Sequence, residues 1–143
     1  MRLGRLVACA ATAFAVPGFA AAPNMKEGLW EITTRMEMVG MPGGMPPQTF
    51  KQCITRKDLE NPHKMATPGG PKDDRCQVSD YKLQGNTATW NWTCKGGEEM
   101  RGTATMTFSG TTYTGVSKMS MQQGGQTHNM TVHYSGKHVG DCK

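Results

Sequence analysis

The segment Thr87-Ala-Thr-Trp-Asn-Trp-Thr-Cys94 alternates strictly between polar and apolar side chains. Ala88, the two tryptophans and Cys94 fall on one side of an extended chain, and the threonines and the asparagine fall on the other. A period of two residues is typical of a β-strand that is buried on one face and exposed to water on the other. The segment therefore predicts an antiparallel sheet with one apolar face and one threonine-rich face.

The same alternation recurs in residues 29–38, 103–108 and 127–134. Glycine-containing pairs that supply the positive φ of tight hairpin turns separate the alternating segments: Gly85-Asn86, Gly96-Gly97, Ser109-Gly110 and Gly124-Gly125. One short helix is predicted over residues 55–62, with Thr55 as its N-cap and Pro62 as its end. We therefore expect an all-β fold, in which seven or so antiparallel strands form a meander that is a strongly curved sheet or an open barrel.

Residues 1–20 have the order of a secretory signal peptide: two arginines, an apolar run from residue 6 to residue 16, then small residues. Cleavage is expected after Ala20, with Ala22 as the alternative, which leaves a single domain over residues 21–143. The apolar run is too short to span a membrane. Cys9 stands in a lipoprotein-like box that begins very early in this run, so lipidation there is a less favoured alternative. The signal predicts a periplasmic or secreted protein.

The overall charge of the mature chain is only mildly basic. Removal of Arg2 and Arg5 with the signal leaves 14 basic and 11 acidic residues, and lowers the net charge from +5 to +3. The lysines are scattered and do not alternate with aromatic residues, so the electrostatic pattern of a nucleic-acid-binding protein is missing. Nucleic acid is therefore not an expected partner.

Four cysteines remain after the signal peptide is removed, and an even number in an exported chain predicts disulfides. If Gly85-Asn86 is a two-residue turn, Cys76 and Cys94 lie opposite each other in one hairpin, provided that one strand carries a single bulge. Cys53 then pairs with Cys142 by elimination. The wide spacing of all four disfavours a zinc site.

Several segments together carry a family resemblance: residues 28–38 (GLWEITTRMEM), MPGGMPP after them, Phe108-x-Gly110 before Tyr113-Thr-Gly115, and Gly140-Asp-Cys142. In this combination the chain resembles the exported bacterial proteins grouped as domain of unknown function family 3617. The resemblance covers nearly the whole mature chain. It implies a periplasmic or outer-envelope location in a Gram-negative bacterium, and it supplies neither an activity nor site residues.

The apolar face of the predicted sheet is the main candidate for a binding site. Aromatic and methionine side chains are expected to gather on it: Trp30, Trp90, Trp92, Met106, Phe108, Tyr113 and Met130. One interpretation is a plain hydrophobic core. The other is a pocket for a lipid-like or peptide ligand, because a curved sheet can leave a lumen and methionine adapts to many partners.

Residues 36–47 (MEMVGMPGGMPP) raise the question of a soft-metal site. Thioethers are preferred ligands of Cu(I), and the candidate ligands are Met36, Met38, Met41 and Met45. However, Met36 and Met38 continue the alternation of the first strand, which commits them to the apolar face. We therefore expect an exposed, flexible loop without a cofactor, and keep Cu(I) binding as the alternative.

No combination of nucleophile, base and orienting group emerges from the sequence. Ser79-x-x-Lys82 has the spacing of an acylating serine motif, but a regular strand directs its two side chains to opposite faces. The sequence therefore favours a non-enzymatic binding or assembly accessory of the cell envelope, whose partner is a hydrophobic small molecule or an envelope protein. The alternative is an envelope hydrolase or isomerase with an unrecognised site.

Overall fold

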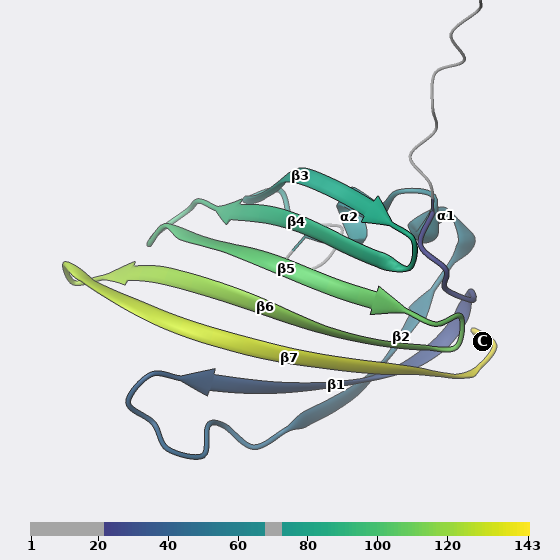
Figure 1. Ribbon diagram of the computed structural model, residues 1–143, viewed down its shortest axis with the longest axis horizontal. Coiled ribbons are helices and arrows are strands. Elements are labelled where there is room, and N and C mark those ends of the chain that lie inside the picture. Colours follow the sequence, from purple (N-terminus) through teal and green to yellow (C-terminus); the bar gives the residue numbers. More distant parts are fainter. Residues whose placement is uncertain (1–21, 68–72) are drawn as a thin grey trace, which may run out of the picture.

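The computed structural model describes residues 22–67 and 73–143 (Figure 1). The predicted signal peptide, with Cys9 and the cleavage site after Ala20, lies outside these residues. The described part contains seven strands and two short helices: β1 (Gly28–Met38), β2 (Gln48–Ile54), α1 (Arg56–Leu59), α2 (Pro62–Met65), β3 (Cys76–Gln84), β4 (Thr87–Cys94), β5 (Met100–Phe108), β6 (Thr112–Gln123) and β7 (Gln126–Gly140).

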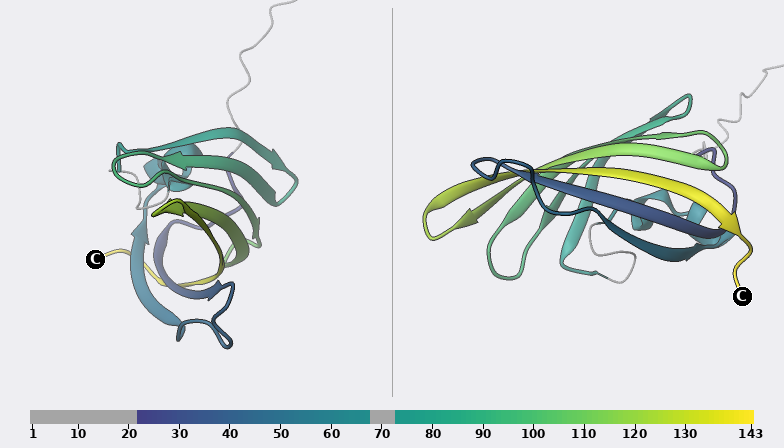
Figure 2. Two further views of the ribbon diagram at one scale, coloured as in Figure 1. Left: turned by 90° about the vertical axis from the view of Figure 1, so that its left-hand side faces the viewer. Right: turned by 90° about the horizontal axis from the view of Figure 1, so that it is seen from below.

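All seven strands belong to one antiparallel sheet, in the order β2-β1-β7-β6-β5-β4-β3. Strands β3 to β7 form a meander, and β7 then pairs with β1 along most of its length. The sheet is curved and not closed, with β2 and β3 as its two edges (Figures 1 and 2). The predicted all-β fold is confirmed. The meander, however, does not run from the first strand to the last, because β1 lies between β2 and β7.

The capping signal in the predicted helix is confirmed, and the extent of the helix is not. Thr55 accepts a hydrogen bond from the backbone NH of Asp58 (3.3 Å) and donates its own NH to the Asp58 carboxylate (2.9 Å). Helix α1 ends at Leu59, and Pro62 begins α2 instead of ending the first helix. Proline suits a first helical position, since the NH that it lacks would have no intrahelical acceptor there.

The predicted bulge and both predicted disulfides are confirmed. Gln84 pairs with Thr87 next to the turn, and Cys76 pairs with Cys94 after a register shift between Ser79 and Lys82. Asp80, inside this bulge, has a φ of 53°. The Cys76–Cys94 disulfide joins Cα atoms 4.0 Å apart, and Cys53–Cys142 joins Cα atoms 5.5 Å apart.

Three glycines allow large side chains to lie flat on the concave face of the sheet. Each of them is the direct cross-strand partner of a large residue: Gly102 of Trp92, Gly115 of Met106 and Gly136 of Tyr113. A Cβ at Gly102 would stand 2.6 Å from the Trp92 ring, and a Cβ at Gly115 or Gly136 would meet Met106 or Tyr113 still more closely. These glycines therefore leave the space that the large side chains occupy.

Gly136→Ala is expected to lower the free energy of unfolding by about 2 kcal/mol, because the new methyl group overlaps the Tyr113 ring. Urea denaturation of Gly136→Ala, Tyr113→Ala and the double variant measures the coupling between the two positions. In the Tyr113→Ala background, the glycine substitution should cost less than half as much. An equal cost in both backgrounds would show that the ring is not what the methyl group meets.

Candidate functional site

A cavity of about 270 Å³ lies on the concave side of the sheet. Its lining comes from four parts of the chain: the segment before β1, the sheet itself, α1, and the end of α2 with the residues after it. Most lining side chains are apolar, and they include Ile32, Ala104 and Met119. The alternation of each strand places these residues on one face, and the curvature of the sheet directs that face inward.

The register explains which side chains meet at the cavity. Trp90 of β4 pairs with Ala104 of β5, which pairs with Ser117 of β6. Directly paired residues of an antiparallel sheet share a face. Across β4, β5 and β6, the bulky indole of Trp90 is thus followed by the small side chains of Ala104 and Ser117. These small side chains leave the concave face hollow.

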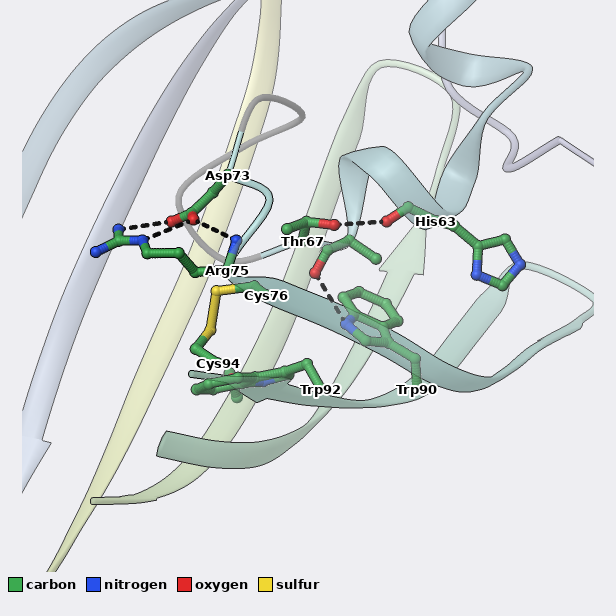
Figure 3. Close-up of a disulfide and its surroundings, with 10 residues drawn as sticks. His63, Thr67, Asp73, Arg75, Cys76, Trp90, Trp92 and Cys94 are labelled. Atoms are coloured by element: carbon green, nitrogen blue, oxygen red, sulfur yellow. Dashed lines mark hydrogen bonds and ion pairs between the residues drawn. A yellow bond between two sulfur atoms is a disulfide. The ribbon is translucent and has the colours of Figure 1, made fainter. Parts of the chain in front are cut away.

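The segment around α2 lies against β3 and beside Trp90 of β4 (Figure 3). The indole NH of Trp90 donates a hydrogen bond to the backbone carbonyl of Ala66 (3.2 Å). Tyr81 stacks on Trp90 with ring centroids 6.0 Å apart, and the ring centroids of His63 and Tyr81 are 5.1 Å apart. Within this segment, the Thr67 hydroxyl donates to the backbone carbonyl of His63 (3.0 Å). These contacts hold Ala66 and Thr67 against the cavity.

Five of the seven predicted ligand-binding residues line the cavity: Trp90, Trp92, Met106, Phe108 and Tyr113. Trp30 does not, because its side chain is fully buried beside Tyr113 and donates its indole NH to the Lys26 carbonyl (2.9 Å). Met130 does not line the cavity either, and lies farther along the concave face, opposite Met119.

The lining also includes residues that the sequence did not indicate. Ala66 and Thr67 follow α2, a second helix that the sequence did not predict. Tyr81 lies on the same face as Leu83, two residues along β3, and stacks on Trp90. The two-residue turn at Gly85-Asn86 by itself sets residue 81 opposite residue 90, so this register is the signal that would have identified Tyr81.

The bulge in β3 corrects the argument against Ser79-x-x-Lys82. Ser79 pairs with Asn91 and Lys82 pairs with Thr89, so both side chains lie on the exposed, threonine-rich face and not on opposite faces. They remain on an edge strand and outside the cavity. Their position does not provide the enclosed helix N-terminus that this chemistry needs.

Three tyrosines line the cavity, and burial raises the pKa of each phenol. Burial, with a smaller contribution from the charge of Tyr134, raises the pKa of Tyr113 to about 12. Burial also raises the pKa of Tyr134 and of Tyr81 above the usual value. The three phenols are consequently neutral at pH 7, and can act there as hydrogen-bonding groups with apolar rings.

Among the described residues that line the cavity, Asp58 is the one with a carboxylate side chain. Hydrogen bonds from the Thr55 side chain, and then from the Thr55 backbone, hold the pKa of Asp58 below its usual value. A general acid or base is most effective when its pKa is near the working pH. The pKa of Asp58 and those of the three tyrosines are all shifted away from neutral pH.

Two buried polar side chains of the cavity lining form a hydrogen bond with each other. The indole NH of Trp92 donates to the hydroxyl of Ser117 (3.3 Å), and both side chains are almost completely buried. Trp92 and Ser117 therefore offer little hydrogen bonding to a ligand.

The four methionines proposed from the sequence as Cu(I) ligands occupy two environments. Met36 and Met38 are half-buried on β1, whereas Met41 and Met45 are 46% and 40% exposed in the β1–β2 connection. The backbone NH of Met45, before the start of β2, donates to the Met36 carbonyl of β1 (2.9 Å), which extends the contact between the two strands beyond the Thr34–Gln48 pair. Among residues 22–67 and 73–143, no three His, Cys, Asp or Glu side chains gather as a metal site would require.

Comparison with known proteins gives one match. The model of a family described as "Protein of unknown function (DUF3617)" matches residues 25–142. No curated protein and no solved structure matches the chain. In the described part of the chain, none of the helices has the length and apolar character needed to cross a membrane.

Proposed function

The chain belongs to the DUF3617 family, and from this premise we propose that it is an exported envelope protein that binds one apolar molecule in its concave cavity. The observation that carries the proposal is the aromatic and methionine lining of a cavity of about 270 Å³. Ligand sites are typically apolar hollows of about 300–1,000 Å³. The cavity is slightly smaller than this range, so a small molecule or a single hydrocarbon chain fits it better than a bulky lipid.

The polar groups of the lining suggest how such a molecule is oriented. Asp58 and Gln52 are half-buried or exposed, whereas Trp92, Ala104 and Ser117 are buried. The apolar part of the ligand is favoured against the buried residues, and an uncharged or cationic end of the ligand is favoured near Asp58. A carboxylate end is disfavoured, because it would lie near a second negative charge in a partly desolvated site.

The cysteines support an extracytoplasmic location. Both pairs among the described cysteines form disulfides, which indicates an oxidising compartment outside the cytoplasm. The predicted signal peptide supports the more specific proposal of the periplasm or secretion. A role as an accessory that presents an apolar molecule to an envelope protein is consistent with this location.

Ala104→Leu is expected to weaken binding of the neutral fluorescent probe N-phenyl-1-naphthylamine by about tenfold or more, because the added branch fills the hollow beside Trp90. Thr105→Leu is the matched control. It makes a similar addition to the next residue of β5, whose side chain is exposed on the other face, and should leave the affinity unchanged. Fluorescence titration measures both affinities, and circular dichroism confirms that both variants are folded.

Equal binding by the wild type and by Ala104→Leu would show that the probe does not enter the cavity. The natural ligand can be identified by native mass spectrometry of the protein isolated from cell envelopes. A bound mass that is retained by Thr105→Leu and lost from Ala104→Leu would support the proposal. If the wild type turns over a substrate and the rate is lost in Tyr113→Phe, the enzymatic alternative would replace it.

A further inference from the structure

We propose a Cu(I) site on the concave face of the sheet, formed by the thioethers of Met38, Met130 and Met119. This set differs from the methionine-rich loop that the sequence suggested. The three residues come from β1, β7 and β6, and are separated by as many as 92 positions along the chain. Only the strand order brings them together.

The register places the three methionines in one row across adjacent strands. Met38 pairs directly with Met130, and Met130 pairs directly with Met119. The Cβ atoms of directly opposite residues are about 4.5–5.5 Å apart, and such residues share a face. All three are half-buried, and Met119 packs against the core and lines the cavity. The row is therefore on the concave side, where curvature tilts neighbouring side chains toward one another.

The methionine side chain is flexible enough for the three sulfurs to reach one ion. Three rotatable bonds allow each sulfur to move along the row and over its neighbour without a change in the backbone. Three sulfurs from adjacent strands are a suitable ligand set for Cu(I), which prefers soft donors and accepts low coordination numbers. Hard cations such as Mg²⁺ or Ca²⁺ require oxygen ligands, which this row does not supply.

Disulfide formation strengthens the case for thioethers. Cys53, Cys76, Cys94 and Cys142 are all oxidised, so none of the described cysteines offers a thiolate to a metal. In an oxidising compartment, methionine is the soft ligand that stays available, because its sulfur does not form disulfides. Export and Cu(I) binding are compatible for this reason.

Two neighbouring side chains add to the site. Trp92 donates its indole NH to Ser117, and its ring therefore crosses Gly102 to reach β6, the strand that carries Met119. An indole at this position can stabilise a bound monovalent cation through its ring face. His128 lies two residues before Met130 on β7 and pairs directly with Met121, so its imidazole is a candidate fourth ligand.

The loop methionines are less suitable than this row. Met41 and Met45 are exposed and lie in a segment with three glycines, which would lose conformational entropy on closing around an ion. The row on the sheet is already ordered by strand pairing. We therefore expect Cu(I) to prefer the sheet over the loop.

Anaerobic titration of the disulfide-intact chain with Cu(I) bicinchoninate tests the site. The wild type should remove one Cu(I) per chain from the chelator. The double substitution Met38→Leu and Met130→Leu, at two positions outside the cavity lining, should weaken the affinity by about 100-fold or more, because two of three sulfurs are lost. The matched control, Met41→Leu with Met45→Leu, removes the same number of sulfurs from the loop and should stay near the wild-type affinity.

Leucine conserves the volume and apolar character of methionine, so both double variants should fold and should still bind N-phenyl-1-naphthylamine. This second measurement separates the copper site from the proposed function, since either can fail alone. Methyl resonances of labelled methionines, recorded with redox-inert Ag(I), should shift at Met38, Met119 and Met130. Absence of Cu(I) binding, or its loss in the loop variant and not in the sheet variant, would overturn the proposal.

Discussion

Replacing Cys53 and Cys142 together by alanine is expected to lower the free energy of unfolding by about 4.6 kcal/mol, the largest effect among the substitutions considered. The disulfide joins residues 89 positions apart, and the chain-entropy model relates the stabilisation to the length of the loop that is closed. It also fastens the edge strand β2, whose strand neighbour in the sheet is β1, to the segment after β7. Thermal unfolding should shift downward by about 15 °C for a chain of this size.

The Cys76–Cys94 pair provides the matched control. Its sequence separation is 18, for which the same model gives about 3.2 kcal/mol. Moreover, the β3–β4 register already holds these two residues opposite each other, so the measured loss should be smaller than that figure. Guanidinium unfolding of the two double-alanine variants compares them directly. A larger loss for Cys76 and Cys94 would contradict the view that the long-range disulfide is the main covalent constraint.

Trp30→Ala is expected to lower the free energy of unfolding by about 4 kcal/mol. The side chain has no exposed surface, and its ring centroid lies 5.6 Å from that of Tyr113 and 5.8 Å from that of His138. The substitution leaves a large cavity and removes the hydrogen bond to the Lys26 carbonyl. Denaturant unfolding followed by circular dichroism measures the loss.

Phe50→Ala is the control for Trp30→Ala. Phe50 pairs with Ile32 on the edge strand and is 47% exposed, so its truncation should cost less than about 1 kcal/mol. Phe50 also lines the cavity and Trp30 does not. Trp30→Ala should therefore mainly lower the free energy of unfolding, whereas Phe50→Ala should mainly weaken the affinity for the apolar probe. Equal stability of both would show that Trp30 is not part of the core.

The strands were predictable where the alternation was uninterrupted, as at Thr87–Cys94. The predicted segments 103–108 and 127–134 are in fact longer, at Met100–Phe108 and Gln126–Gly140. Gly102 and Gly136 lie in the missing parts, and a glycine has no side chain to mark either face. These extensions are stabilised by pairing with neighbouring strands, which the local sequence does not record.

The candidate site was predictable only in part. Trp90, Trp92 and Phe108 share a face because of their spacing, and that face does line the cavity. Spacing alone could not separate Trp30, which is buried in the core, from these lining residues. The difference depends on which neighbours cover each residue, and these neighbours include distant segments, such as Tyr113 beside Trp30 and Ala66 beside Trp90.

The sequence by itself determined the two faces of the sheet, the hairpin turns and the pairing of the cysteines. The faces, the turns and the Cys76–Cys94 pair follow from local backbone geometry: side chains alternate along a strand, glycine adopts positive φ, and a two-residue turn sets the register of its hairpin. The Cys53–Cys142 pair then follows by elimination. Only the tertiary structure decided that β1 lies between β2 and β7, that the segment at Ala66 lines the cavity, and that Met38, Met130 and Met119 form one row. Strand order depends on pairing between residues far apart in the chain, and many partners satisfy the same alternating pattern, so no local signal distinguishes them.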